Sequence, residues 1–319
     1  MKFTFIMPAY NAEITIERAI RSIMEQTYKD LQILVIDDGS KDGTLEIIKS
    51  LAKEDSRIEY YHKENGGIGS AYIYAFGKVK GDYCLFVDSD DYVEKTLVND
   101  VNLTIRQTNA DVVQFGLKMF DEDGNSLSSI HFPAKELCGI ENILKDYFYG
   151  LTEGRNFPGL SIRAIRSSFF NDFDYYSSSL SIDEILAAHI LARANKIVFL
   201  DREYYCLIAY TTSVSRAKVT TKKVIGQFEG LALIPNIVKD FNLEIQTLVV
   251  IKLLSYAANF YEYYAEGYGN KTARKKMQEL YVFYRKNRRH VKISLKTKIT
   301  IWFLRYFPFI NIIKNKISR

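Results

Sequence analysis

Cysteine and histidine are scarce in this chain of 319 residues, with three cysteines and four histidines. Cys84, Cys138 and Cys206 are far apart and odd in number, so they form neither a disulfide framework nor a zinc-ligand pattern, which suits a reducing cytosol. The histidines show no paired spacing on one helix face. These absences argue against disulfide-stapled folds and against zinc enzymes.

Long apolar runs are also missing. No uninterrupted stretch reaches the roughly 18 apolar residues of a membrane-spanning helix, and residues 1–8 are too short for a signal-peptide core. The chain is nevertheless 47% hydrophobic and 14% aromatic, which is enough for a sizeable core. We therefore expect a folded protein with one large domain and an appendage, or with two domains.

Acidic residues are absent from 285–319, which contains 11 lysines and arginines. The rest of the chain has 32 basic and 38 acidic residues, so the net charge of +5 comes from this tail. The tail joins a basic stretch to an aromatic one around Trp302, a composition that suits a helix in an anionic membrane interface. The alternative is a C-terminal helix packed on protein, and no nucleic-acid module is recognisable.

Strand-like and helix-like segments alternate over the first 120 residues. Such alternation predicts right-handed βαβ units and an α/β fold with a mostly parallel sheet covered by helices on both faces. The expected strands are 2–7, 32–36, 58–61 and 83–87, and the expected helices are 13–26, 44–51, 69–79 and 95–107. Further along we expect a helix over 181–194, strands over 197–200 and 203–208, and helices after about 216.

Each of the first four strands is followed directly by a polar cluster. Ligands of parallel sheets bind beyond the carboxyl ends of the strands, so the four clusters can line one cleft. The clusters are Pro8-Ala9-Tyr10-Asn11, Asp37-Asp38-Gly39-Ser40, Lys63-Glu64-Asn65-Gly66-Gly67 and Asp88-Ser89-Asp90-Asp91.

The fourth cluster has three carboxylates within four residues, which repel one another unless a cation or donors compensate. Oxygen ligands and a diphosphate suit a hard divalent cation such as Mg²⁺ or Mn²⁺. The alternative is a turn in which an aspartate caps the next helix. In the second cluster Asp38 can accept the N–H of a pyrimidine base, although Asp-Gly and Ser also form plain turns.

The first and third clusters are weaker indications. Pro8 and Tyr10 offer a rigid turn and an aromatic face for a base, or only a strand end with a packed tyrosine. The Asn65–Gly69 segment could let backbone approach a phosphate, or could be a simple turn.

Taken together, the order and spacing of these clusters resemble family 2 inverting glycosyltransferases of the bacterial cell-envelope and capsular-polysaccharide kind, which have the GT-A fold. The resemblance covers about residues 1–110 and continues more weakly to about 215. It implies a catalytic domain over 1–215, with a nucleotide-binding half 1–110 and an acceptor half 111–215, and a helical region over 216–319. The matching stretches are 6–11, 22–27, 35–40, 65–67 and 81–91.

The resemblance also implies roles for single residues. Pro8, Ala9 and Tyr10 would hold uracil and Asp38 would accept from it, with Asn65 and Gly67 near the nucleotide and Asn11 contributing less. Asp88 and Ser89 would face the ribose and metal region, Asp90 would be the direct ligand of Mn²⁺ or Mg²⁺, and Asp91 would support it.

Two departures from the family pattern concern the acceptor side. Ser181-Ile182-Asp183-Glu184 resembles the family's acidic pair before a helix, but Ile182 replaces the first acid. Direct displacement with inversion needs a carboxylate base, and the resemblance assigns this role to Asp183, with Glu184 as the fallback. The alternative is an acidic helix N-terminus favoured by the helix dipole. Tyr72 stands where relatives carry an arginine, so Lys63, Arg163 or Arg166 would have to supply the cation.

The sequence thus predicts an enzyme that transfers a hexosyl or N-acetylhexosaminyl group from a UDP-sugar to a glycan or lipid-linked acceptor. We expect it at the cytoplasmic face of the cell membrane, attached peripherally through 285–319. Both a monomer and a homo-oligomer are compatible with the sequence. The competing interpretations are a sugar nucleotidyltransferase, an oxidoreductase and an inactive membrane-surface module. The first two would require a glycine-rich loop after the first strand, where Pro8-Ala9-Tyr10-Asn11 stands instead.

Overall fold

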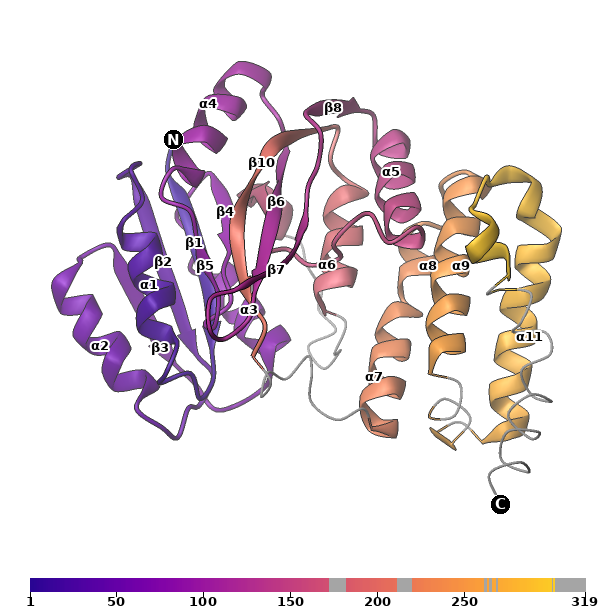
Figure 1. Ribbon diagram of the computed structural model, residues 1–319, viewed down its shortest axis with the longest axis horizontal. Helices are drawn as coiled ribbons and strands as arrows, with labels where there is room; N and C mark the ends of the chain where they lie inside the picture. Colours follow the sequence, from indigo (N-terminus) through magenta and orange to yellow (C-terminus); the bar gives the residue numbers. More distant parts are fainter. Residues whose placement is uncertain are drawn as a thin grey trace. The chain divides into compact units, whose positions relative to one another are not determined.

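The computed structural model describes residues 1–171, 182–210, 220–260, 263, 266–267, 269–299 and 301. The chain divides into two compact units (Figure 1). The first unit comprises 1–143 and 159–217, and the second comprises 144–158 and 218–319. The sequence predicts a division into 1–215 and 216–319, which does not assign residues 144–158 to the second unit. This division into domains stays a prediction.

The first unit is built on a ten-stranded sheet with the order β3-β2-β1-β4-β9-β6-β10-β5, with β7 paired to β6 and β8 to β10. In its first four strands β1 pairs in parallel with β2 and β4, and β2 pairs in parallel with β3. The α/β fold and the alternation predicted for the first 120 residues are confirmed. The elements are β1 (Phe3–Ala9), α1 (Ile16–Met24), β2 (Leu31–Asp37), α2 (Thr44–Glu54), β3 (Ile58–His62), α3 (Ile68–Phe76), β4 (Tyr83–Phe86), β5 (Tyr92–Val93) and α4 (Leu97–Thr108).

Burial explains why these segments fold as they do. All seven residues of β2 and six of the seven in β1 are buried, as expected for strands covered on both faces. In α1 the buried residues are Ile16, Ala19, Ile20 and Ile23, the helical stripe that the sequence pattern predicts. These parallel strands start near the N-terminus at the top of Figure 1, so their carboxyl ends share the lower edge of the sheet.

The remainder of the sheet is mixed and was not predicted in this detail. β9 runs antiparallel to β4 and β6, whereas β6 and β10 are parallel. The two strands expected over 197–200 and 203–208 are one long strand, because β10 continues through a register shift between Phe199 and Glu203. The elements are β6 (Val112–Phe120), β7 (Ser126–Ile130), β8 (Lys135–Cys138), α5 (Ile140–Thr152), β9 (Arg163–Arg166), α6 (Ile182–Leu191) and β10 (Lys196–Ile208).

The second unit is helical in its described part, as predicted after residue 216. Its helices are α7 (Thr221–Leu231), α8 (Ile234–Ile237), α9 (Leu243–Asn259) and α11 (Asn270–Asn287), together with the larger part of α5. Glu153, the residue after α5, accepts hydrogen bonds from the backbone N–H of Ser294 and from the hydroxyl of Thr297. None of the helices in the described ranges combines the length and the apolar character that crossing a bilayer requires.

Candidate active site

The loops after β1 and β2 are joined by backbone and side-chain hydrogen bonds. The N–H of Asp38 donates to the carbonyl of Ala9 at 2.8 Å, and the N–H of Lys41 donates to Asn11 Oδ1 at 2.9 Å. Asn11 adopts a left-handed backbone conformation with φ 49°, which asparagine tolerates better than most residues. Beside this junction Pro8 is half-buried in β1, and the Tyr10 side chain is 47% exposed and can meet a ligand.

Asp38, in the loop after β2, forms hydrogen bonds with the loop after β3. Its carboxylate is 3% exposed and accepts from the N–H groups of Gly66 and Gly67 at 3.0 and 2.7 Å. Lys63 Nζ donates to the same carboxylate at 2.5 Å. A carboxylate has about four acceptor positions, so Asp38 has capacity left for one more donor such as a pyrimidine N–H. Asn65 itself is exposed.

Gly39 shows how tightly these loops approach each other. Its φ is +79°, and a Cβ at this position would lie 2.8 Å from the backbone nitrogen of Asn65 and 3.1 Å from the carbonyl oxygen of Lys63. A side chain at Gly39 would therefore both strain the backbone and separate the two loops. The neighbouring Asp37 is fully buried and contacts His62 Nδ1 at 2.5 Å, so the first aspartate of the pair has a structural partner.

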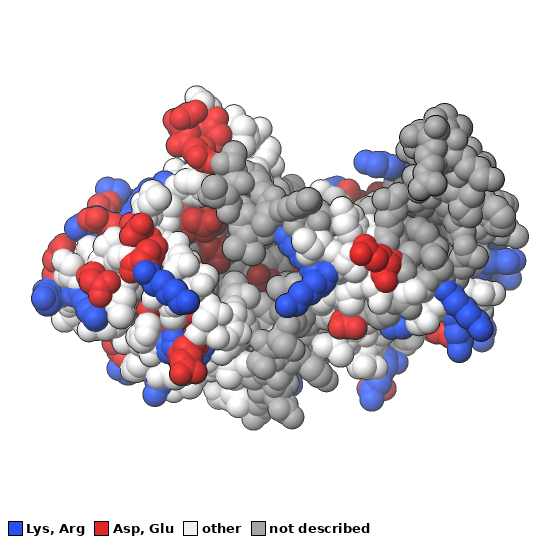
Figure 2. Space-filling view, turned by 90° about the horizontal axis from the view of Figure 1, so that it is seen from below, with Lys and Arg blue, Asp and Glu red and all other residues white. Residues whose placement is uncertain are grey.

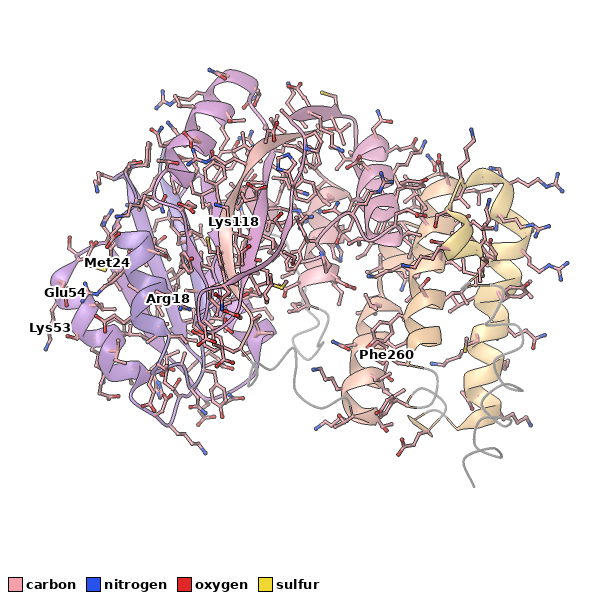
Figure 3. The ribbon with its side chains drawn as sticks, viewed as in Figure 1. Arg18, Met24, Lys53, Glu54, Lys118 and Phe260 are labelled. Atoms are coloured by element: carbon pink, nitrogen blue, oxygen red, sulfur yellow. The ribbon has the colours of Figure 1, made fainter. Side chains whose placement is uncertain are left out.

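The fourth cluster is a turn whose last residue is anchored inside the protein. Asp91 is 3% exposed, and it accepts from the Tyr205 hydroxyl at 2.7 Å and from the N–H of Ile208 at 2.8 Å. Burial raises the pKa of Asp91 to about 7. Arg18 of α1, labelled in Figure 3, donates to the carbonyl of Asp90 at 2.5 Å and so holds the turn from the other side.

The contacts of Asp91 give a first prediction. Asp91→Ala would leave the buried Tyr205 hydroxyl and Ile208 N–H without their acceptor, and each unsatisfied buried group costs about 1–3 kcal/mol. We therefore expect the free energy of unfolding to fall by about 2–4 kcal/mol, measured by urea denaturation. The control is Asp121→Ala at an exposed turn of the same unit, which should lose clearly less. Equal losses in both variants would contradict the assignment of Asp91 as an internal anchor.

Asp88 and Asp90 remain half-buried with Ser89 between them. Burial, together with the charges of Asp91, Asp183 and Asp90, raises the pKa of Asp88 well above its usual range. Burial also raises the pKa of Asp90. Crowded carboxylates of this kind fit a hard divalent cation, which supplies the missing positive charge.

The carboxylates do not form a complete metal cage by themselves. Within the described ranges no three His, Cys, Asp or Glu side chains are grouped as a preformed metal site. A cation held by Asp88 and Asp90 would therefore need further oxygen ligands from a bound diphosphate and water. Figure 2, which looks at the molecule from below, shows acidic side chains set into a hollow of this face.

Asp183, in the first turn of α6, belongs to the same cluster of charges. Burial, followed by the charge of Glu184, raises the pKa of Asp183 to about 6. Its Oδ1 atom is buried and has no hydrogen-bond partner among the residues that the structure describes. Ser181, where the helix was expected to begin, lies outside those residues, and the described helix begins at Ile182.

Tyr72 is the partner of Asp183 that the sequence did not indicate. The Tyr72 side chain is 2% exposed, and its ring meets that of Phe86 edge to face with 5.4 Å between centroids. Its hydroxyl forms a hydrogen bond with Asp183, and this bond counteracts the effect of burial on the pKa of the carboxyl group. Tyr72 therefore occupies the position of the expected cation with a group that stabilises the Asp183 anion.

The three cations considered as substitutes differ in position. Arg166 pairs with Tyr83 at the first residue of β4, so it lies at the edge of the sheet opposite the clusters, where it binds Asp111. Arg163 is fully buried and donates to Gln114 at 3.0 Å. Lys63, bound to Asp38, lies within the clusters themselves.

Two of the contacts made by these carboxylates could not be predicted from the sequence. Asp91 and Tyr205 are 114 positions apart, and Tyr72 and Asp183 come from different helices. The two tyrosines differ in no local feature from the other 21 of the chain. The one local indication for Tyr205 is that it lies in a segment, 203–208, for which the sequence predicts a strand.

Comparison with known proteins gives the family. The sequence profile of glycosyl transferase family 2 matches residues 4–169, more than half of the chain. Glycosyltransferase GlyA of Streptococcus pneumoniae serotype 4 is 28% identical over 219 residues, which are 67% of this chain and 32% of GlyA. The chain thus spans about a third of the length of that curated relative.

Two solved structures show the same fold. S. aureus TarS 1–349 in complex with UDP-GlcNAc has a TM-score of 0.65 at 24% identity, and the match covers 82% of this chain and 73% of the TarS 1–349 chain. Mannosyltransferase PcManGT of Pyrobaculum calidifontis, in complex with GDP-Man and Mn²⁺, has a TM-score of 0.52 at 14% identity, with 89% and 86% covered. The likeness shows that the first unit has the α/β GT-A fold. Together with the profile match it places the chain in glycosyl transferase family 2.

Proposed function

We propose that this protein transfers a sugar from a UDP-sugar to a hydroxyl group of a glycan or lipid-linked acceptor, with inversion at the anomeric carbon. The observation that carries the proposal is the meeting of all four strand-end clusters at the carboxyl ends of the four parallel strands β1 to β4, with the Asp183 charge acting on Asp88. The donor side and the acceptor side of a transfer reaction would then be neighbours. The chemistry of TarS, whose structure contains UDP-GlcNAc, supports a uridine nucleotide as the donor.

The donor side would bind the nucleotide through groups that are accessible or have hydrogen-bonding capacity left. Tyr10 offers an exposed ring for the base, and Asp38 can accept one more donor beside Gly66 and Gly67. Asn65 is exposed next to this carboxylate and can reach the nucleotide. Lys63 would place a positive charge near the diphosphate, in the role that arginine plays where Tyr72 stands here.

A divalent cation held by Asp90 and Asp88 would neutralise the charge that develops on the UDP leaving group. Asp91 would support these two residues indirectly, because its own carboxylate is engaged by Tyr205 and Ile208. The mannosyltransferase with Mn²⁺ supports this proposal by showing a cation in a protein of the same fold. Mn²⁺ and Mg²⁺ both suit the oxygen ligands available.

Asp183 would be the general base. Its carboxylate would take the proton of the acceptor hydroxyl while that oxygen bonds to the anomeric carbon and UDP leaves from the opposite face of the sugar. This displacement inverts the anomeric configuration. A pKa raised by burial to about 6 keeps Asp183 ionised at neutral pH and still basic enough to accept a proton.

Tyr72→Phe gives a prediction on this base. Removing the phenol removes a hydrogen bond that favours the Asp183 anion, so the pKa of Asp183 rises and the acid limb of kcat/KM moves to higher pH. Below about pH 6 we expect an activity loss of roughly tenfold, which corresponds to a charge-assisted hydrogen bond of about 1.5 kcal/mol. Tyr74→Phe on the same helix is the control. An unchanged pH profile in Tyr72→Phe would contradict the assigned contact.

The acceptor and the cellular location follow from the chemistry of the tail. Basic residues 285–319 next to Trp302 would hold the enzyme at the cytoplasmic face of an anionic membrane, beside a lipid-linked intermediate of cell-envelope polysaccharide synthesis. Residues 302–319 lie outside the described part of the chain. Homo-oligomer formation stays a prediction that light scattering can test.

Product analysis tests the proposal. The protein is incubated with UDP-glucose, UDP-galactose, UDP-GlcNAc or UDP-GalNAc, with Mn²⁺ or Mg²⁺ and with lipid-linked acceptors, and the new linkage is examined by proton NMR. We expect a β-linked product from an α-linked donor and no product after chelation of the metal. An α-linked product would contradict inversion, and metal-independent transfer would contradict the role of Asp90.

A further inference from the structure

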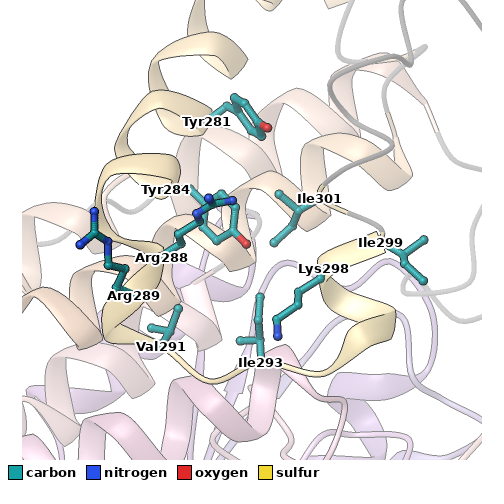
Figure 4. Close-up of a pocket in the computed structure, with 9 residues that line it drawn as sticks. All are labelled: Tyr281, Tyr284, Arg288, Arg289, Val291, Ile293, Lys298, Ile299 and Ile301. Carbon is teal, nitrogen blue, oxygen red and sulfur yellow. The ribbon is translucent and has the colours of Figure 1, made fainter.

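A pocket of about 530 Å³ lies in the helical unit, on the C-terminal half of α11 and the segment that follows it (Figure 4). It belongs entirely to the second unit and contains no residue of the predicted nucleotide-sugar site. Its described lining consists of three cations, two tyrosines and four aliphatic side chains: Arg288, Arg289, Lys298, Tyr281, Tyr284, Val291, Ile293, Ile299 and Ile301.

The inner wall of the pocket is apolar. Ile301 is 1% exposed, and Val291, Ile293 and Tyr284 are also buried. Ile299 and the partly exposed Tyr281 stand nearer the solvent. The pocket therefore offers hydrophobic contact both at its base and at its mouth, which a purely ionic ligand would leave unused.

The three basic side chains of the pocket form no ion pair with a described acidic residue. Arg288, Arg289 and Lys298 are exposed, and within the described ranges none of them forms an ion pair with an Asp or Glu. Figure 4 shows Arg288 beside Tyr284 and Lys298 beside Ile293, on two sides of the same opening. The sequence of 285–319 contains no Asp or Glu.

A ligand that satisfies both features must join an anionic head to an apolar body. Arginine binds phosphate through two parallel N–H donors, and lysine adds a point charge. Basic pockets beside apolar side chains are suited to phospholipid head groups at a membrane surface. Nucleic acid and free nucleotides would provide the phosphate but would leave the isoleucine surface in contact with water.

We propose that this pocket binds a single anionic phospholipid, with the phosphate at Arg288, Arg289 and Lys298 and the beginning of the acyl chains against Ile299 and Tyr281. The inference deepens the proposed membrane location and rests on that part of the proposed function. A defined lipid site in this pocket would add a specific contact to the general electrostatic attraction between the basic tail and an anionic membrane. It requires no transferase activity.

The test is titration calorimetry of the full-length protein with short-chain phosphatidylglycerol kept below its micelle concentration, so that no membrane surface is present. Trp302 is the single tryptophan of the chain and follows Ile301 in the sequence, so its fluorescence provides a second signal. The pocket variant is Arg288→Gln/Arg289→Gln/Lys298→Gln. The matched control removes three exposed charges of α11 outside the pocket, Lys271→Gln/Lys275→Gln/Lys286→Gln.

We expect saturable binding of one lipid by the wild type and the control, and an affinity about 100-fold lower in the pocket variant, from about 1 kcal/mol for each basic residue. Short-chain phosphatidylcholine should bind far less tightly. No saturable binding by the wild type, or equal losses in the two variants, would overturn the lipid site. Glycerol phosphate binding as tightly as the lipid would overturn it in favour of a soluble phosphate.

Vesicle sedimentation separates this proposal from the general membrane location. Wild type that sediments with phosphatidylglycerol vesicles but binds no monomeric lipid would retain the membrane location and overturn the pocket. Sugar transfer to a soluble acceptor measures the active-site assignment independently of both, because the pocket shares no residue with that site.

Discussion

Asp183→Asn is expected to lower kcat for sugar transfer by about 10²–10⁴-fold, the usual contribution of a general base. The affinity for the UDP-sugar should change little, because Asp183 is assigned to the acceptor hydroxyl and not to the nucleotide. The amide keeps the size of the side chain and its acceptor oxygen for the Tyr72 hydroxyl, so the fold around α6 should persist. Steady-state kinetics and binding of the UDP-sugar measure the two effects separately.

The pH profile strengthens this test. Burial raises the pKa of Asp183 to about 6, and the base acts only in its ionised form, so kcat/KM should rise as pH increases through about 6. The residual activity of Asp183→Asn should lack this limb. Glu184→Gln, the neighbouring carboxylate, serves as the control and also tests the alternative register. Transfer lost in Glu184→Gln but preserved in Asp183→Asn would move the base by one residue.

Asp90→Ala is expected to remove metal-dependent donor binding and to lower kcat/KM by about 10³-fold, the equivalent of about 4 kcal/mol of leaving-group stabilisation. The half-buried Asp90 side chain does not anchor the turn, because Arg18 binds its backbone carbonyl and Asp91 makes the internal contacts. Thermal stability without ligand should therefore remain near that of the wild type. Titration with Mn²⁺ in the presence of UDP provides the measurement.

Asp82→Asn is the matched control for the Asp90 variant. It removes one negative charge at the amino end of β4, where Asp82 accepts the N–H of Lys2 at 2.9 Å, on the opposite edge from the clusters. Its kinetics with Mn²⁺ should resemble those of the wild type. Asp90→Ala with an unchanged metal requirement would refute the assignment of Asp90 as ligand.

The first half of the fold could be predicted because its signals are local. β1, β2 and β4 are apolar runs followed by turn residues, whereas β3 is a short strand of mixed polarity. α1 shows its buried stripe directly in Ile16, Ala19, Ile20 and Ile23. The parallel order β3-β2-β1-β4 then brings the strand ends together, and this confirms the prediction that the polar clusters share one edge. Local patterns suffice where successive strands are joined by helices in regular βαβ units.

The second half depends on contacts between distant residues. The short β9 inserts between β4 and β6, and no local pattern distinguishes it from a loop. The path of 144–158 into the helical unit is likewise invisible in the composition. At the site itself, the engagement of Asp91 by Tyr205 and of Asp183 by Tyr72 required three-dimensional information. The sequence therefore indicated where these carboxylates lie relative to the strands better than it indicated which residues hold them, and their roles stay predictions.

Titration calorimetry of UDP-sugars, in Mn²⁺ and in EDTA, tests the central claim that the strand-end clusters form a metal-dependent site for a UDP-sugar. At least one UDP-sugar should bind with one-to-one stoichiometry in Mn²⁺ and lose most of its affinity in EDTA, while GDP-mannose binds more weakly. The absence of metal-dependent binding by every UDP-sugar, or tighter binding of GDP-mannose than of all of them, would contradict it.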